Sequence, residues 1–299
     1  MQSTSKILMI RPINFGFNEQ TAGNNSFQVR GFEENSNDLA QKEFDQFVSI
    51  LKENLVDVIT IQDSSEPVTP DSIFPNNWFS THEDKTMVLY PMYAPNRREE
   101  RKESVIEKIK EICNIKRVVD LTHLENDSKF LEGTGSMILD RDNNLLYACK
   151  SPRTDESALE EFCDQLDYDM FVFEAYDRDS KEIYHTNVMM SVCSDFVTIC
   201  LDSIKDLNQR ESIIELIEES GKEILEISLD QMENFAGNML EIRSTKGEKI
   251  IVMSKRAYES LDSDQIETIA HYAKIIYSNL ETIENNGGGS ARCMIAELF

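Results

Sequence analysis

The residues 287–299 combine glycines, an arginine and a cysteine in a way that predicts a nucleophilic sulfur. The run Gly287–Gly289 lets the backbone take positive φ angles and approach a ligand closely. Arg292 adds a positive charge beside Cys293, which favours the thiolate over the thiol. The apolar run 294–299 predicts a buried last strand that anchors the sulfur. An inert thiol after a glycine-rich turn is the alternative, and the rest of the chain must decide between the two.

Two further residues could complete covalent chemistry with Cys293. His185 can protonate a leaving amine and later activate water, because an unperturbed imidazole titrates near neutrality. Glu132 could bind a cationic or N–H-rich face of a substrate inside a closed cavity. Each also has a structural explanation: Glu132 precedes Gly133 and could stabilise a turn, and His185 could be a core or surface histidine.

Five amphipathic segments predict the helices that must position these residues. Apolar side chains recur at helical spacing in them, and each is followed by a short β-like run. The predicted helices are 38–53, 96–113, a third from an N-cap at Thr154 or Asp155 to Leu166, 204–220 ending before Gly221 as its C′ residue, and 262–278. The predicted strands are 56–61, 118–121, 170–173, 224–227 and 280–283.

The helix starts are separated by 58, 58, 50 and 58 residues, which indicates a fivefold structural repeat. A polar, turn-flanked position follows each predicted strand after 10 to 16 residues. These positions are Asn77, Glu132, His185, Asn238 and Cys293. If the units surround a common axis, the five side chains converge on one cavity. An ordinary doubly wound sheet, with the asparagines marking turns, is the alternative.

Composition narrows the class of protein. The chain has 299 residues, of which 40% are hydrophobic and 28% charged, as is ordinary for a globular protein. Its formal charge of −25 argues against a nucleic-acid or anionic-membrane partner, since no basic stripe offsets it. No apolar run approaches the roughly 18 residues that span a bilayer, and residues 1–6 do not open a signal peptide. We therefore expect a cytoplasmic protein.

Cysteine and histidine usage predicts neither disulfides nor a metal. The six cysteines do not form a disulfide scaffold in so long a chain, and no C-x-x-C or H-E-x-x-H pair occurs. The cysteines expected to be core thiols are Cys113, Cys149, Cys163, Cys193 and Cys200. The histidines expected to be structural or solvated are His82, His123 and His271.

Three motifs together resemble the guanidine-modifying superfamily, which has the pentein fold. They are Glu132-Gly133, His185-x-Asn187 and Gly287-Gly288-Gly289-x-x-Arg292-Cys293-Met294. This superfamily includes arginine deiminase, dimethylarginine dimethylaminohydrolase, N-succinylarginine dihydrolase and glycine amidinotransferase. The chain is most similar to the amidinotransferase-like proteins of citrulline utilisation (CtlX type). The resemblance implies one catalytic domain over residues 1–299, an α/β-propeller of five ββαβ units around a pseudo-fivefold axis.

The resemblance also implies covalent catalysis without a metal or organic cofactor. Cys293 would attack the guanidinium or ureido carbon of a small amino acid. His185 would protonate the departing amine and then activate water. Glu132 would hold the N–H groups of the substrate. Asn77, Asn187, Asn238 and Arg292 are expected to bind the substrate.

The chain departs from arginine deiminases at two places. Deiminases carry aspartates where this chain has Asn77 and Asn187, and those aspartates clamp a guanidinium cation. A carboxylate only accepts hydrogen bonds, whereas an amide also donates them. We therefore expect a neutral ureido substrate, citrulline or an acylated relative, to be favoured. The segment 132–136 also departs from the Glu-Gly-Gly-Asp usual in deiminases.

Other functions stay open at this point. An amidinotransferase would pass the one-carbon unit to an amine, an arginine deiminase-type enzyme would stop at citrulline, and a non-catalytic pentein would serve as a binding module. The loop 12–30 could cover the cavity, and contacts to a substrate carboxylate could come from Asn18, Asn24, Asn25 and Arg30. Arg97 and Arg98 open a helix among glutamates and are expected to be solvated. A homo-oligomer is compatible with the sequence.

Overall fold

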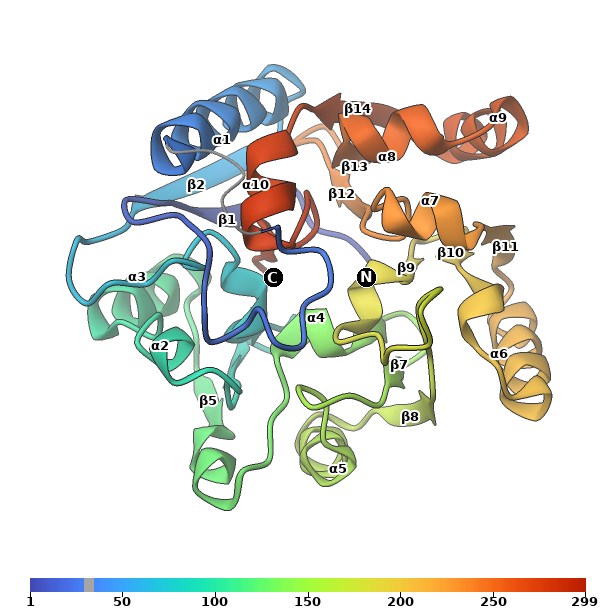
Figure 1. Ribbon diagram of the computed structural model, residues 1–299, viewed down its shortest axis with the longest axis horizontal. Coiled ribbons are helices and arrows are strands. Elements are labelled where there is room, and N and C mark those ends of the chain that lie inside the picture. Colours follow the sequence, from blue (N-terminus) through green and yellow to red (C-terminus); the bar gives the residue numbers. More distant parts are fainter. Residues whose placement is uncertain (30–34) are drawn as a thin grey trace.

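The computed structural model describes residues 1–29 and 35–299, and it contains five small β-sheets arranged around a central axis (Figure 1). Each sheet has three strands, of which the first pairs antiparallel with the second and the second pairs parallel with the third. A helix connects the second strand to the third, as a parallel pair requires. The predicted α/β arrangement of five ββαβ units is confirmed.

Four of the units follow one another along the chain. The first of these units contains β3 (Phe79–Thr81), β4 (Thr86–Leu89), α3 (Glu103–Cys113) and β5 (Arg117–Asp120), and the second contains β6 (Ile138–Asp140), β7 (Leu145–Cys149), α5 (Glu156–Leu166) and β8 (Asp169–Phe173). The third contains β9 (Met190–Val192), β10 (Phe196–Ile199), α6 (Leu207–Glu219) and β11 (Glu223–Glu226). The fourth contains β12 (Leu240–Arg243), β13 (Lys249–Ser254), α9 (Ser263–Tyr272) and β14 (Lys274–Ser278). Two additional turns of 3₁₀-helix are η2 (Thr122–Asp127) and η4 (Leu201–Ser203).

The two ends of the chain build the fifth unit together. The last strand, β15 (Ala296–Glu297), pairs antiparallel with β1 (Lys6–Arg11), with Leu8 opposite Ala296. After α1 (Ser36–Glu53) the chain returns as β2 (Asp57–Gln62), which pairs parallel with β1. The buried last strand predicted for residues 294–299 is therefore present, though it is short.

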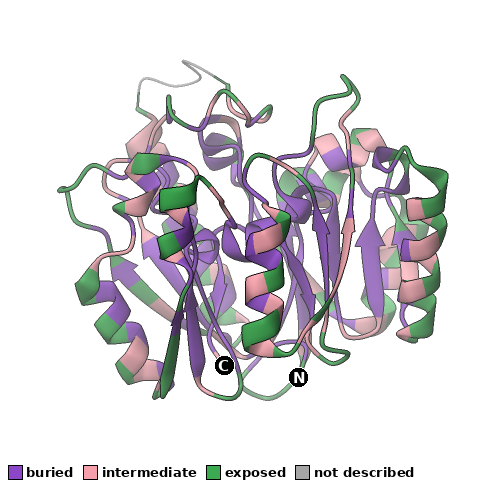
Figure 2. Ribbon diagram, turned by 90° about the horizontal axis from the view of Figure 1, so that it is seen from below, coloured by how far each residue is buried: buried purple, intermediate pink, exposed green. Residues whose placement is uncertain are grey.

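Each peripheral helix buries one face against its sheet and exposes the other (Figure 2). In α1 the buried side chains include Phe44, Phe47 and Leu51, which lie in one cluster with Ile7 and Met9 of β1. Full burial of such a side chain contributes roughly 1.5–3 kcal/mol. The apolar side chains thus pack between each sheet and its helix, and polar residues lie at the centre of the ring of five units.

Local sequence signals explain where several helices begin and end. Asp155 is the N-cap of α5 and accepts hydrogen bonds from the backbone of Ser157 and Ala158. Asp262 and Gln265 form a capping box at the start of α9. Gly221 follows α6 with a φ of 75°, in keeping with its predicted position after the helix.

Three predicted elements differ from the structure. The segment predicted as one helix over 96–113 is divided into α2 (Pro95–Arg98) and α3. The predicted strand 280–283 belongs to α10 (Glu281–Gly287), because the Glu43 carboxylate of α1 accepts hydrogen bonds from the backbone N–H groups of Thr282 and Ile283 and caps that helix. The fifth parallel strand is β14, which forms the end of the segment predicted as helix 262–278.

A short helical turn precedes the first strand of each unit and lies near the axis, where α4 and α10 are seen in Figure 1. Three of these turns are η1 (Pro75–Asn77), α4 (Gly133–Ser136) and η3 (Thr186–Val188). The other two are the turns 234–239, after α7 (Leu229–Glu233), and 290–294, after α10. All five candidate residues at the expected fivefold positions lie on or directly beside these turns.

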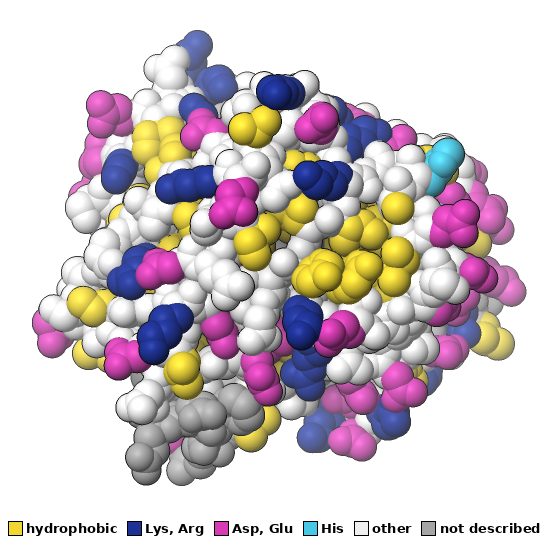
Figure 3. Space-filling model, turned by 90° about the horizontal axis from the view of Figure 1, so that it is seen from above, with side chains coloured by type: hydrophobic (Ala, Val, Ile, Leu, Met, Phe, Trp, Pro, Cys, Tyr) yellow, Lys and Arg dark blue, Asp and Glu magenta, His cyan; other side chains and the backbone are white. Residues whose placement is uncertain are grey.

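The surface is mixed in charge. On the face shown in Figure 3, lysines and arginines lie scattered among acidic side chains, and a group of hydrophobic side chains lies between them. Among the described residues, no helix combines the length and the apolar character needed to cross a bilayer.

Candidate active site

A small cavity lies where the central turns meet. It leaves about 20 Å³ for the centre of a water-sized molecule, which is room for little more than one water. Its lining residues come from segments that are far apart in the sequence: Asn25, Asp71, Phe74, Asn77, Arg97, Arg153, Tyr184, His185, Gly287, Gly288, Gly289 and Cys293. A substrate of amino-acid size can therefore enter only if a wall of the cavity moves.

His185 and Glu132 form a buried hydrogen-bonded pair. The Nε2 atom of His185 lies 2.8 Å from Oε2 of Glu132, and neither side chain is more than 3% exposed. The other carboxylate oxygen accepts from the backbone N–H of Tyr93 at 3.1 Å. The guanidinium groups of Arg153 and Arg97 lie 3.4 Å and 3.7 Å from Oε2. These two candidate residues are therefore in direct contact in the structure.

The charges around this pair define its protonation. Burial opposes ionisation of Glu132, but Arg153, the hydrogen bond from His185 and Arg97 together hold the pKa of Glu132 well below its usual range. Burial, aided by the two arginines, lowers the pKa of His185 to about 4 despite Glu132. At neutral pH an ionised Glu132 therefore accepts the Nε2–H proton of a neutral imidazole, which leaves Nδ1 of His185 as the basic nitrogen.

Two asparagine side chains hold the sulfur of Cys293. The Nδ2 atoms of Asn187 and Asn238 lie 3.4 Å and 3.2 Å from Sγ, and Cys293 is only 4% exposed. Asn238 is oriented by a bond from its Nδ2 to the Asn187 carbonyl and by the backbone N–H of Arg292, which donates to its Oδ1. Both residues were predicted to bind substrate. The structure places their amide donors beside Sγ of Cys293, where they can stabilise negative charge on the sulfur.

Asn77 lines the cavity and has an unpaired donor. Its Oδ1 accepts a hydrogen bond of 2.8 Å from Nη1 of Arg97, and its buried Nδ2 has no partner among the described residues. Because a guanidinium can only donate, the bond from Arg97 defines which end of the amide is oxygen. Gly135 makes room for this arrangement: a Cβ on it would collide with Asn77 Nδ2 and lie 2.8 Å from Nδ1 of His185.

Arg97 is buried in the structure, not solvated. It was expected to be solvated, but it is 2% exposed and lines the cavity. It forms two hydrogen bonds to Glu100, of 2.9 Å and 3.0 Å, and its Nε lies 3.8 Å from Asp71. Burial lowers the pKa of Arg97, but Glu100 and Asp71 more than compensate and raise it, so the cation is retained. Arg98, the second arginine expected to be solvated, is partly exposed.

Arg153 is a cavity residue that the sequence analysis missed. Its guanidinium bonds to the Thr21 carbonyl at 3.1 Å and to Oδ1 of Asn24, and it lies over the ring of Tyr184 at 4.9 Å. Arg97 and Arg153 both lie between the second strand of a unit and its helix, after β4 and β7. This equivalent position in two repeated units is the sequence feature that could have identified both arginines as cavity residues.

Arg292 does not line the cavity. Its guanidinium lies 3.0 Å from the Ile295 carbonyl and 3.1 Å from Oε2 of Glu297. Its contribution to the site is its backbone N–H, which orients Asn238. The prediction that its side chain binds substrate is not supported by this placement.

The N-terminal loop closes one side of the cavity. Asn25 lines it, Asn18 donates to Asp71 at 2.7 Å, and Asn24 contacts Arg153. Arg30 lies outside the described residues. The loop predicted over 12–30 therefore contacts the cavity mainly by hydrogen bonds to the charged side chains that line the cavity.

The remaining histidines and cysteines lie away from this cavity. His82 is buried and bonds to Ser80 at 2.9 Å, whereas His123 and His271 lie at the surface. All six cysteines are free, and Cys163 is half-buried while the others expected in the core are buried.

Five ββαβ units around a central axis define the fold of the pentein superfamily. The sequence pattern of one family within it, described as N,N-dimethylarginine dimethylhydrolase, eukaryotic, matches residues 11–299. The chain belongs to this family. The CtlX-type resemblance stays a prediction.

Solved structures share the fold at low sequence identity. The N-terminal domain of ArgZ, an arginine dihydrolase from the ornithine-ammonia cycle in Cyanobacteria, superposes with a TM-score of 0.77 at 19% identity, covering 98% of this chain and 97% of that domain. AgrE in a binary complex with L-arginine has a TM-score of 0.76 at 18% identity, covering 98% of this chain and 40% of AgrE.

A dimethylarginine dimethylaminohydrolase bearing an adduct with S-methyl-L-thiocitrulline gives a TM-score of 0.69 at 13% identity, over 99% of this chain and 100% of the other. No curated protein sequence matches the chain.

Proposed function

We propose that residues 1–299 form one catalytic domain that hydrolyses a C–N bond of a guanidino or ureido amino acid through a covalent adduct on Cys293. The family membership and the contacts of Cys293, His185 and Glu132 support this. The carrying observation is the free amide donor of Asn77 inside the cavity, which favours a neutral ureido group, and hence citrulline, as a substrate.

The proposed reaction uses each residue in turn. Cys293 gives its proton to His185, and Sγ then bonds to the central carbon of the substrate. His185 passes the proton to the departing amine as the C–N bond breaks, which leaves a thiouronium or thiocarbamate on sulfur. Water then loses a proton to His185, adds to the same carbon and displaces Sγ. The N–H groups of Asn187 and Asn238 stabilise the sulfur whenever it carries negative charge.

The substrate preference rests on hydrogen-bond donors and acceptors. A guanidinium group offers only N–H donors, and these cannot pair with the Nδ2–H groups of Asn77. A ureido group offers a carbonyl oxygen, which can. We therefore propose that citrulline is accepted, and that arginine is carried through citrulline to ornithine, with two ammonia molecules and carbon dioxide released.

The amino-acid end of the substrate would be held by charged side chains of the cavity wall. Arg97 and Arg153 line the cavity and offer cations to the α-carboxylate. Asp71 lines the same cavity, and its Oδ1 is buried without a partner among the described residues, so it can accept from the α-ammonium group. A buried acceptor left unpaired costs free energy, which a bound ammonium group would recover.

The test is an assay of the purified protein with arginine and with citrulline, with ornithine and citrulline measured as products. We expect ornithine from both substrates. Fast citrulline release from arginine, with citrulline itself inert, would contradict the ureido preference. Acid quenching during turnover should show a mass increment on Cys293 that includes the amino-acid chain, and its size separates an N-alkyl thiouronium from an N-alkyl thiocarbamate adduct. The Cys293→Ser variant should show no increment.

A further inference from the structure

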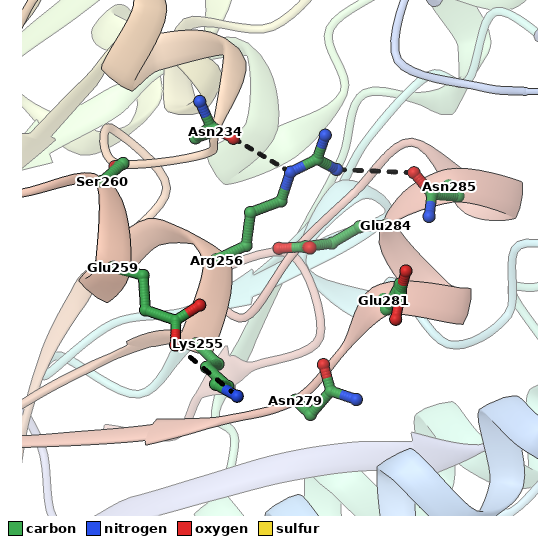
Figure 4. Close-up of a pocket in the computed structure, with 9 residues that line it drawn as sticks. All are labelled: Asn234, Lys255, Arg256, Glu259, Ser260, Asn279, Glu281, Glu284 and Asn285. Atoms are coloured by element: carbon green, nitrogen blue, oxygen red, sulfur yellow. Dashed lines mark hydrogen bonds and ion pairs between the residues drawn. The ribbon is translucent and has the colours of Figure 1, made fainter.

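A second, larger pocket lies on the other side of α10 from the active-site cavity. It is a polar hollow of about 530 Å³, within the range of small-molecule sites, and we name it the α8–α10 pocket. It lies between α8 (Lys255–Ser260), the end of α7 and the first turns of α10 (Figure 4). Its lining residues are Asn234, Lys255, Arg256, Glu259, Ser260, Asn279, Glu281, Glu284 and Asn285. None of these residues lines the active-site cavity.

One wall of the α8–α10 pocket carries a guanidinium group that bonds directly to no carboxylate among the described residues. The Arg256 guanidinium bonds to two neutral amide oxygens, Oδ1 of Asn234 at 3.2 Å and Oδ1 of Asn285 at 3.4 Å. Among the described residues, no carboxylate lies within ion-pair distance of it. Lys255 beside it forms an exposed ion pair with Glu259 at 3.5 Å, and no other ion pair of Lys255 is seen within residues 1–29 and 35–299. Both cations are thus available to an anionic group of a ligand, and a guanidinium can bind a carboxylate through two parallel hydrogen bonds.

The pocket is also lined by two carboxylates of α10. Glu284 is 1% exposed and points toward the Arg256 side of the pocket in Figure 4, while Glu281 is exposed at the rim. Burial raises the pKa of Glu284 to about 7, whereas hydrogen bonds from Ser254 and Ser290 and the positive charge of Arg256 act against this rise. A cationic group placed beside Glu284 would favour its ionised form and compensate its buried charge.

The arrangement of charge selects the class of ligand. A simple anion such as phosphate would be attracted by Arg256 and repelled by Glu281 and Glu284. A simple cation would be attracted by the two glutamates and repelled by Arg256. A zwitterion with its charges a few ångströms apart can pair with the arginine and the glutamates at once. Free α-amino acids have this form.

The α8–α10 pocket is connected to the nucleophile through α10. Ser290 donates to Oε1 of Glu284 at 2.6 Å, and the Ser290 carbonyl accepts from the backbone N–H of Cys293 at 3.0 Å. On the next residue of the helix, the carbonyl of Asn285 accepts from the backbone N–H of Val29 at 2.7 Å, in the N-terminal loop that closes the cavity. A ligand that moves Glu284 or withdraws Asn285 from Arg256 therefore acts on both the sulfur-bearing turn and the loop.

We propose that the α8–α10 pocket binds a free α-amino acid, with its carboxylate on Arg256 and Lys255 and its ammonium group on Glu284 and Glu281, and that this binding changes the rate of the reaction at Cys293. The site is separate from the active-site cavity. Its ligand is of the same chemical class as the proposed substrate and product, so it would act as a sensor of amino-acid concentration.

The test compares binding of L-ornithine, L-arginine and L-citrulline by titration calorimetry in the Cys293→Ser background, where turnover is blocked. Adding Lys255→Gln and Arg256→Gln should remove one binding event or weaken it by at least about tenfold, the loss expected for charge-assisted hydrogen bonds. Glu281→Lys should weaken the same event. The matched control is Lys246→Gln, which removes an exposed lysine outside the pocket and should change nothing.

The same variants separate this proposal from the proposed function. A binding event that the double variant removes supports the α8–α10 pocket even if the active site itself binds no amino acid. Amino-acid binding that is identical in the double variant and the control overturns it. In the enzyme with Cys293 intact, added ornithine should change kcat/KM severalfold beyond simple competition, and this component should vanish with Lys255→Gln and Arg256→Gln. Purely competitive behaviour in both proteins would refute the coupling.

Discussion

Arg97 donates a hydrogen bond of 2.8 Å from Nη1 to Oδ1 of Asn77, and this contact identifies the oxygen end of an amide that lines the active-site cavity. The donor end is the one left without a partner. A residue on α2 that never needs to touch the reacting atoms can thus influence which substrate is accepted. The arrangement links substrate choice to a buried ion cluster of Arg97, Glu100 and Asp71.

Replacing Asn77 with aspartate should shift the enzyme from ureido toward guanidino substrates. The new oxygen would face the ureido carbonyl oxygen and leave both unpaired, at a cost of about 1–3 kcal/mol. We expect kcat/KM for citrulline to fall by roughly 5- to 150-fold, and citrulline to accumulate during turnover of arginine. Steady-state kinetics on both substrates measure this.

The control for this change is Asn208→Asp, which adds the same charge at an exposed position of α6. It should leave the ratio of the two kcat/KM values unchanged. Equal loss on arginine and citrulline in Asn77→Asp would show that Asn77 only supports the local structure.

Gly135→Ala should lower activity much more than stability. An added Cβ would collide with Asn77 Nδ2 and lie 2.8 Å from Nδ1 of His185, so both side chains must shift. Displacement of reacting groups by about 1 Å costs on the order of 10²-fold in rate. Gly23→Ala is the matched control, since a Cβ there meets no atom within 4 Å. Kinetics and thermal unfolding of both variants test this, and a fully active Gly135→Ala enzyme would be inconsistent with the described cavity.

The buried His185 should make the fold less stable in weak acid. Its pKa is lowered to about 4, whereas an unfolded histidine titrates near 6.5, so between these values the unfolded chain binds more protons than the folded one. The free energy of unfolding therefore decreases as pH falls from about 6.5 toward 4. By pH 4.5 this residue alone lowers the free energy of unfolding by roughly 2–3 kcal/mol.

His185→Gln keeps a donor for Glu132 and removes the titrating ring, so the loss of stability between pH 7 and pH 4.5 should shrink by that amount. Urea unfolding at the two pH values measures it. His271→Gln, at the surface, is the control and should leave the pH dependence as in the wild type. An unchanged pH dependence in His185→Gln would mean that the imidazole is not held neutral.

Arg97→Gln should destabilise the protein strongly, because it leaves Asp71 and Glu100 buried without their cation. Breaking a buried ion pair in this way costs about 3–5 kcal/mol, and protonation of Glu100, whose pKa burial already raises to about 7, favours the lower end. Arg98→Gln, the neighbouring partly exposed arginine, should cost less than about 1 kcal/mol. Chemical denaturation of both variants gives the comparison, and similar losses would disprove the burial of Arg97.

The fivefold repeat was readable in the sequence because each unit repeats the same order of helix, strand and turn. That order placed Asn77, Glu132, His185, Asn238 and Cys293 at equivalent junctions, and the structure brings these junctions to one centre. The direction in which each side chain points was not readable. Asn238 meets the sulfur rather than an open space for substrate because two backbone groups hold its amide.

The elements that the sequence did not predict depend on tertiary contacts. Arg97 lies among glutamates along the chain, and only the fold shows that Glu100 and Asp71 are buried with it. The apolar residues 280–283 resemble a strand, but the Glu43 carboxylate, contributed by α1, caps them as the start of α10. The Arg292 side chain is drawn from the sulfur by Glu297, whose position follows from the pairing of β15 with β1.

That pairing of the last strand with the first has a consequence for assembly. Cys293 lies three residues before β15, so the segment that seals the ring also delivers the sulfur. If Cys293 is the nucleophile, as proposed, a chain whose final strand is undocked would lack a fixed sulfur at its centre. The activity would then depend on the pairing of β15 with β1.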